Sequence, residues 1–80
     1  MTLNDAVARR VIKLLSESNM SQYRLEQKSG ITHGCMYKIL NGKNKTVTLS
    51  SIYRLARGFD MTVMEFLGDE LFSSEMLEID

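Results

Sequence analysis

Only one histidine and one cysteine are present in this 80-residue chain. His33 and Cys35 alone cannot form a zinc site, which takes three or four protein ligands. No nucleophile, base and orienting group can be assembled around the single histidine, and no glycine-rich phosphate-binding loop is present. The sequence therefore predicts no enzyme, no metal site and no cofactor. We expect Cys35 to be a small apolar packing residue.

The stretch from Ser21 to Lys45 instead carries polar, basic and aromatic side chains at spacings suited to binding. Ser21 and Gln22 place a cap and an amide at an expected helix start, where free N–H groups and the helix dipole favour an anion such as phosphate. Gly30 supplies the permissive backbone that a sharp turn between two helices needs. Apolar residues on both sides of this glycine are spaced to hold the two helices at a fixed angle; they are Leu25, Ile31, Met36 and Ile39.

Charge is divided along the chain, although the formal net charge is zero. All ten lysines and arginines precede residue 60, and residues 1–59 sum to +7. Residues 60–80 hold seven acids and no base, and sum to −7. A basic body with an acidic tail is typical of a protein that binds a polyanion. The alternative is a chance segregation of surface charges.

Helical periodicity and capping residues predict five short helices and no sheet. The expected helices span about residues 4–18, 21–29 and 32–41, followed by one that Thr48 caps and one that opens with the capping box Thr62–Glu65 and closes at Gly68. The fourth should turn five residues inward: Leu49, Ile52, Leu55, Ala56 and Phe59. None of these helices would be stable alone in water, so each must bury its apolar stripe against the others.

We expect the chain to be cytoplasmic, for two reasons. The lone cysteine cannot form an internal disulfide, so the fold needs no oxidising compartment. The first residues carry an early acid and no long apolar core, unlike a signal peptide. Apolar runs fall far short of the roughly 20 residues that span a bilayer, so no membrane association is expected.

The stretch SQYRLEQKSGITHGCMYKILNG, residues 21–42, resembles the helix-turn-helix of the phage-repressor/Cro family, the xenobiotic-response-element (XRE) family of bacterial regulators. The resemblance continues through Thr48-Leu49, Ile52, Leu55-Ala56 and Thr62 to Leu67, and covers about residues 7–67. It implies a compact, all-α, five-helix repressor-like bundle in which the second and third helices form the helix-turn-helix. It also implies sequence-specific binding of double-stranded DNA by a transcriptional regulator, expected to be a repressor, with the recognition helix (about residues 32–41) in the major groove.

The resemblance assigns base reading to the outward face of the recognition helix, at His33, Gly34, Tyr37 and Lys38. Lys38 can donate to guanine O6 and N7, and His33 can donate or accept at a purine edge. Gly34 has no side chain to read a base, so it either allows close approach of the backbone or marks a lost contact, and we favour the lost contact. The alternatives are a merely solvent-facing His33 and a half-exposed packing role for Tyr37.

Phosphate contacts are expected from residues that flank the groove. They are Gln22, Tyr23, Arg24, Thr32, Lys43, Asn44 and Lys45. Such contacts position a protein on DNA and carry most of the salt dependence, but they specify no sequence. For any single lysine, the alternative is a solvated charge that touches nothing.

The sequence departs from the family pattern in two places. Relatives often carry a small residue at the position of Glu26, so we expect this side chain to point outward. Many relatives also pair an arginine near the end of the first helix with a glutamate just before Asn-Gly. This chain has Leu15 and Leu40 there. Because both members differ together, we predict that Leu15 contacts Leu40.

We divide the chain into a DNA-binding domain, residues 1–68, and an acidic, partly apolar tail, residues 69–80. The tail either folds back as an extra C-terminal helix or forms a surface for a protein partner. Helix-turn-helix proteins commonly bind DNA as two-fold dimers, so a homodimer is expected. Its interface candidates are Phe59, Met61, Met64, Phe66 and the tail. The alternative function is an antitoxin-like or adaptor module whose tail captures a protein.

Overall fold

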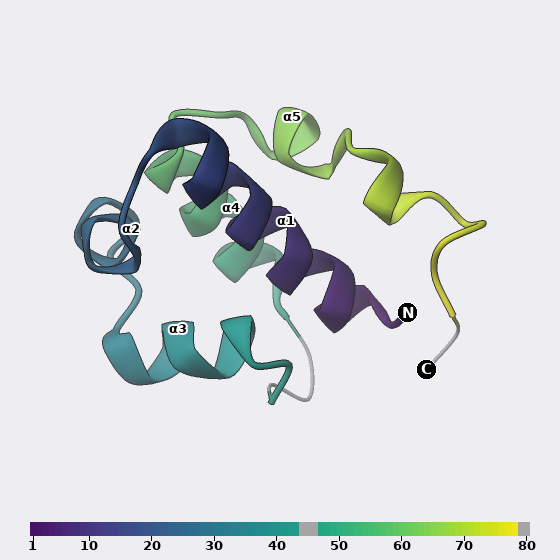
Figure 1. Ribbon diagram of the computed structural model, residues 1–80, viewed down its shortest axis with the longest axis horizontal. Helices are drawn as coiled ribbons and strands as arrows, with labels where there is room; N and C mark the ends of the chain where they lie inside the picture. Colours follow the sequence, from purple (N-terminus) through teal and green to yellow (C-terminus); the bar gives the residue numbers. More distant parts are fainter. Residues whose placement is uncertain (44–46, 79–80) are drawn as a thin grey trace.

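Five α-helices and one short 3₁₀ turn form the fold in the computed structural model, which describes residues 1–43 and 47–78. They are α1 (Leu3–Ser18), α2 (Gln22–Ser29), α3 (His33–Leu40), α4 (Leu49–Gly58), α5 (Val63–Leu67) and η1 (Glu70–Phe72) (Figure 1). The described ranges contain no strand. The predicted all-α class and its five helices are therefore confirmed. None of the described helices has the length and apolar character needed to cross a membrane.

Each α-helix begins at a side-chain oxygen that accepts a hydrogen bond from a backbone N–H in its first turn. These caps are Thr2, Ser21, Thr32, Thr48 and Thr62. At Thr2 and Thr62 the backbone N–H of the cap residue also donates to the side chain of the acid three residues further on, which completes a capping box. A cap of this kind stabilises a helix by about 1 kcal/mol. Because caps are local, the predicted helix starts agree with the observed ones to within about one residue.

A left-handed residue ends each of the first two helices. Asn19 closes α1 at φ 55°, and Gly30 closes α2 at φ 73°, where its N–H bonds to Glu26 O. The turn that follows Gly30 is short because Thr32 already caps α3, and the buried Ile31 anchors it to the core. The sequence features that predict a helix-turn-helix thus appear as a tight turn between α2 and α3.

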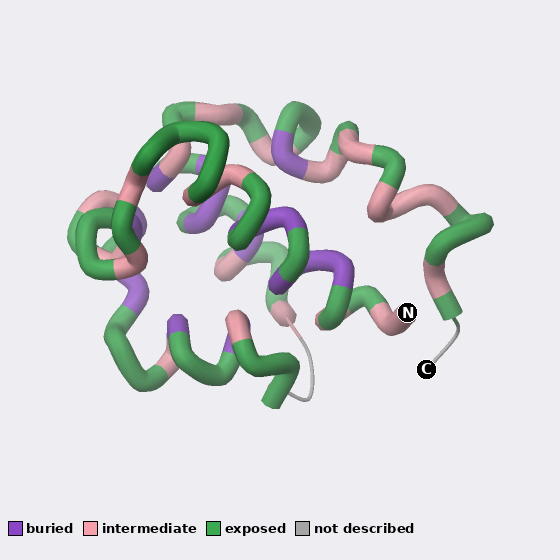
Figure 2. The backbone as a smooth tube through the Cα atoms, viewed as in Figure 1, coloured by how far each residue is buried: buried purple, intermediate pink, exposed green. Residues whose placement is uncertain are grey.

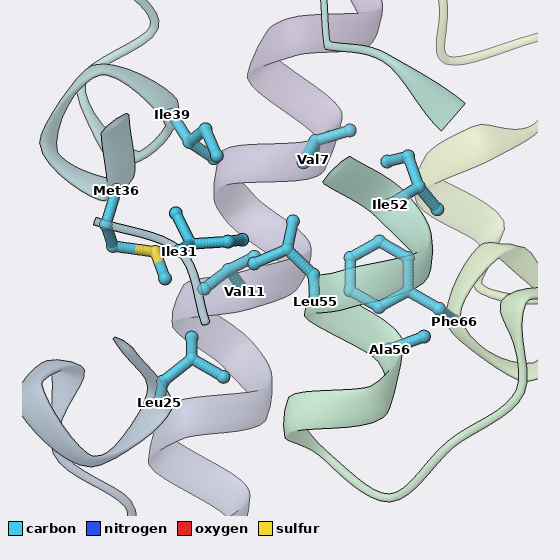
Figure 3. Close-up of a cluster of buried hydrophobic side chains, with 10 residues drawn as sticks. All are labelled: Val7, Val11, Leu25, Ile31, Met36, Ile39, Ile52, Leu55, Ala56 and Phe66. Carbon is cyan, nitrogen blue, oxygen red and sulfur yellow. The ribbon is translucent and has the colours of Figure 1, made fainter. Parts of the chain in front are cut away.

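Every α-helix contributes to one hydrophobic core, which lies between α1 and α4 and the helices around them (Figures 2 and 3). Its buried members are Val7, Val11, Leu25, Ile31, Met36, Ile39, Ile52, Leu55, Ala56 and Phe66. The most extensive helix pairings are α2 with α4, α1 with α3, and α4 with α5. Leu25, Ile31, Met36 and Ile39, which were expected to hold the two helices of the turn, are all part of this core.

Two expectations about apolar residues are wrong. Leu49 was predicted to face inward but is 71% exposed. It is the first residue of α4, and helical side chains lean toward the N-terminus, so it projects past the part of α4 that the other helices cover. Phe66 was a candidate for a dimer interface but is fully buried in the core and has no surface to offer a partner.

The first part of the tail folds back on α1. The Asp69 carboxylate lies 3.2 Å from Arg10 Nη1 and 2.8 Å from Lys13 Nζ. Arg10, itself buried, also donates to the carbonyls of Phe66 at 2.9 Å and Glu65 at 3.1 Å. The element formed here is the 3₁₀ turn η1, not a further α-helix. The division of the chain at residue 68 and a protein partner for the tail stay predictions.

Leu15 and Leu40 are both half-buried against the core. Leu40 lines a shallow surface depression together with Ala8 and Ile12, which precede Leu15 along α1. The predicted contact between Leu15 and Leu40 stays a prediction.

Candidate nucleic-acid interface

The third helix has one buried face and one exposed face. Met36 and Ile39 are directed into the core and are essentially fully buried. Residues 33, 34, 37 and 38 share the opposite side of the helix, and all four are exposed. Figure 2 shows α3 at the rim of the molecule, with no other helix covering its outer side. The four residues predicted to read bases therefore lie together on an accessible surface; their role is still a prediction.

His33 is the first residue of α3, and it is linked to α2 through Glu26. The imidazole Nδ1 lies 2.9 Å from Glu26 Oε2, and the same oxygen accepts a hydrogen bond from Gln22 Nε2 at 3.0 Å. The Glu26 side chain is only 11% exposed, whereas that of His33 is 77% exposed. The hydrogen bond from Gln22 and then that from His33 hold the pKa of Glu26 below its ordinary value of 4.5.

The expectation that Glu26 points outward is therefore wrong. Two hydrogen-bond donors replace the water that a carboxylate would otherwise need, so the side chain can stay close to the α2–α3 junction. Half of this arrangement has a signal in the sequence, because Gln22 and Glu26 are four residues apart on one helix face. The contact with His33 involves another helix, α3, and sequence spacing alone does not identify this partner of Glu26.

The end of α3 holds a lysine beside an aromatic ring. Lys43 Nζ lies 5.4 Å from the centroid of the Tyr37 ring, a cation–π geometry. The backbone fixes this arrangement, since Lys43 N–H donates to Lys38 O at 2.9 Å and Gly42 takes a φ of 65°. Asn41 Nδ2 donates to Tyr37 O at 2.8 Å. A predicted base-reading residue and a predicted phosphate contact are thus brought together at one end of the helix.

The residues predicted to contact phosphate lie mostly at the start of α2 and around α3. Tyr23, Arg24, Thr32 and Lys43 are exposed, and Gln22 is half-buried. Thr32 Oγ1 is used to cap α3, where it accepts from Cys35 N–H at 3.3 Å. Asn44 and Lys45 lie outside the described residues. Cys35 is free and half-buried against the core, as expected for a packing residue.

Acids near the C-terminus form ion pairs with basic residues other than Arg24, Lys38 and Lys43. Asp69 pairs with Arg10 and Lys13, and Asp60 pairs with Lys28 at 2.9 Å. In contrast, no carboxylate of the described ranges lies within 4 Å of the charged groups of Arg24, Lys38 and Lys43. The charges of Arg24, Lys38 and Lys43 are therefore not neutralised by an ion pair within the described ranges. An unpaired basic surface of this kind favours a polyanion.

A family model of the Cro/C1-type HTH DNA-binding domain matches residues 10–70. The matched range includes the second half of α1, all of α2, α3, α4 and α5, and the first residue of η1. Neither the curated proteins nor the solved structures gave a match to the chain.

Proposed function

Since the chain belongs to the Cro/C1-type HTH DNA-binding domain family, a family of DNA-binding transcription regulators, we propose that it acts as a repressor that reads specific sequences of double-stranded DNA. In this proposal α3 enters the major groove, and α2 crosses the backbone beside it. The observation that carries the proposal is the division of α3 into a core face and an exposed face that holds His33, Gly34, Tyr37 and Lys38. Repression needs only occupancy of the DNA. The protein would act in the cytoplasm, beside the chromosomal DNA.

The exposed face supplies groups for direct readout. The Lys38 ammonium can donate to guanine O6 and N7, and the His33 imidazole projects from the leading edge of the helix. At Gly34, an added Cβ would meet no atom within 4 Å, so this position is open but offers no side chain to a base. Tyr37 presents its ring to a thymine methyl or a phosphate, with the Lys43 ammonium beside it.

The start of α2 supplies groups for the phosphates. In its first turn the side chain of Ser21 accepts from Arg24 N–H, so the N–H groups of Gln22 and Tyr23 are left to an external acceptor. Such N–H groups, helped by the helix dipole, bind phosphate well. Arg24 in the first turn of α2 and Lys43 after the end of α3 are exposed and add positive charge. These groups would set affinity and its salt dependence without reading sequence.

We further propose that two copies bind together. One helix-turn-helix module buries little DNA surface and binds weakly alone, whereas a two-fold dimer reads two half-sites about 34 Å apart. Met64 on α5 is 85% exposed, and Phe59 and Met61 are half-buried, so these three apolar side chains are the candidates for contact with the second copy. The adaptor alternative is weaker, because Asp69 of the tail is already bound to α1.

Selection of bound sequences from a random duplex library tests this function. The full chain should enrich one motif with two related half-sites, and a duplex of that motif should bind more tightly than a scrambled duplex at the same salt concentration. Analytical ultracentrifugation of the complex should give two chains per duplex. A library that shows no enriched motif would exclude sequence-specific binding, and one chain per duplex would exclude the dimer.

A further inference from the structure

One oxygen of Glu26 joins a residue predicted to contact phosphate to a residue predicted to read bases. Glu26 Oε2 accepts from Gln22 Nε2 at 3.0 Å and lies 2.9 Å from His33 Nδ1. The carboxylate is almost covered, whereas the imidazole extends into solvent from the start of α3. The three side chains therefore form a network that spans the helix-turn-helix and ends at its DNA-facing edge.

The network determines which imidazole nitrogen carries the proton. The ordinary pKa of this carboxyl group, 4.5, is well below neutrality, and the hydrogen bond from Gln22 lowers the pKa of Glu26 further, so the carboxylate is ionised near neutral pH and can only accept. A contact of 2.9 Å then requires Nδ1 to donate. In the neutral ring the proton resides on Nδ1, because the bond made by one ring nitrogen sets the state of the other. Nε2 is left as an acceptor on the exposed edge.

An acceptor at the groove restricts the bases that His33 can bind. In the major groove, hydrogen-bond donors are the N4 amino group of cytosine and the N6 amino group of adenine, whereas guanine and thymine offer acceptors and the thymine methyl group. We infer that Glu26 is a positioning residue for base recognition, which holds His33 Nδ1 protonated so that Nε2 selects adenine or cytosine. The selection rests on the proposed function, because it requires α3 to lie in the major groove.

The chain offers a matched pair of variants. In Glu26→Gln a carbonyl oxygen can replace Oε2 and accept from both Gln22 and His33, because one oxygen already serves both donors. Glu26→Ala removes that oxygen. Both variants remove the negative charge, so both should bind any duplex more tightly through reduced repulsion of the phosphates. Only Glu26→Ala should change the tautomer and the base preference.

The tautomer can be measured without DNA. Ring ¹⁵N chemical shifts of the full-length protein, taken where the imidazole is neutral, should show Nδ1–H in the unchanged protein and in Glu26→Gln. In Glu26→Ala the proton should move largely to Nε2, while the backbone amide spectrum confirms that the fold is kept. An Nε2–H ring in the unchanged protein, or the same tautomer in both variants, would overturn the inference.

Base preference tests the consequence. The position that His33 reads is located as the one whose preference is lost in His33→Ala, and all four bases are then compared there in the selected duplex. Adenine or cytosine should be preferred by about tenfold. The preference should survive in Glu26→Gln. In Glu26→Ala it should be lost, and any preference that remains should move toward the acceptors of guanine or thymine, because Nε2 then donates. If the chain selects no duplex at all, the proposed function fails. If it selects one and Glu26→Ala keeps the preference, the inference alone fails.

Discussion

Gly58 of α4 lies so close to Leu25 of α2 that a Cβ at position 58 would fall 2.6 Å from Leu25 Cδ1. The same Cβ would be 3.2 Å from Ser29 Cβ. Gly58 is helical and needs no unusual φ. Glycine is suited to this position because it has no side chain, which lets the two helices approach closely. This close approach sets how deeply α2 sits on α4. It thereby sets where Glu26 of α2 meets His33 of α3.

We predict that Gly58→Ala destabilises the protein despite the better helix propensity of alanine. Leu25 is fully buried and cannot swing away freely, so the overpacking cost of about 1–3 kcal/mol should exceed the gain of about 1 kcal/mol from propensity. Urea unfolding should show a net loss of about 1 kcal/mol. Gly34→Ala is the matched control, because its Cβ meets nothing within 4 Å, and it should be stabilising. Equal stability changes in the two variants would contradict the packing argument.

We predict that Asp69→Ala weakens the fold through Arg10. The Arg10 guanidinium is buried between α1 and the tail, and it would lose its only carboxylate partner among the described residues. Loss of a hydrogen bond to a charged group costs about 2 kcal/mol, to be measured by thermal or urea unfolding. The neighbouring exposed acid gives a control, since Glu70→Ala should change stability by less than about 0.5 kcal/mol. A similar small effect from both substitutions would show that the buried pair adds little.

The same carboxylate gives an acid-dependent stability. The hydrogen bond from Lys13, followed by that from Leu71 N–H, holds the pKa of Asp69 below its ordinary value of 3.8 in the folded state. The unfolded state therefore takes up a proton more readily, so the stabilisation is fully present above 3.8 and is lost as the pH falls through the lower, folded pKa. Unfolding free energies measured from about pH 6 to pH 2 should decline, and the decline should be shallower in Asp69→Ala. Equal pH slopes in the two proteins would show that protonation of Asp69 does not cause the loss of stability at low pH.

Lys43→Ala should reduce the salt dependence of DNA binding. Its ammonium has no carboxylate partner in the described part of the chain and lies beside Tyr37 at the end of α3. Removing one phosphate contact lowers the slope of log K against log salt by about 1. Lys13→Ala removes the same charge from α1, where Asp69 already pairs with it, and should leave the slope unchanged. A slope that changes equally in both would mean that only net charge matters.

Local signals predicted the elements well, because caps act within one helical turn. The oxygens of Thr48 and Thr62 start α4 and α5 where the sequence indicated. Burial was less predictable. Periodicity identifies the apolar face of a helix, but it does not show how much of that face the neighbouring helices cover. Leu49 is exposed and Phe66 is buried for that reason. The mostly covered position of Glu26 depends on a histidine contributed by another helix, which no local pattern reveals.

If the exposed face of α3 reads bases, substitution of Lys38 should reveal it most directly. Binding of Lys38→Ala and Lys43→Ala should be measured on the selected duplex and on every single-base variant of it, at one salt concentration. Lys38→Ala should lose about 1–3 kcal/mol of discrimination at one base position and keep the rest, whereas Lys43→Ala should weaken every duplex alike. A uniform loss from Lys38→Ala, with preference unchanged at every position, would show that this face of α3 does not read bases.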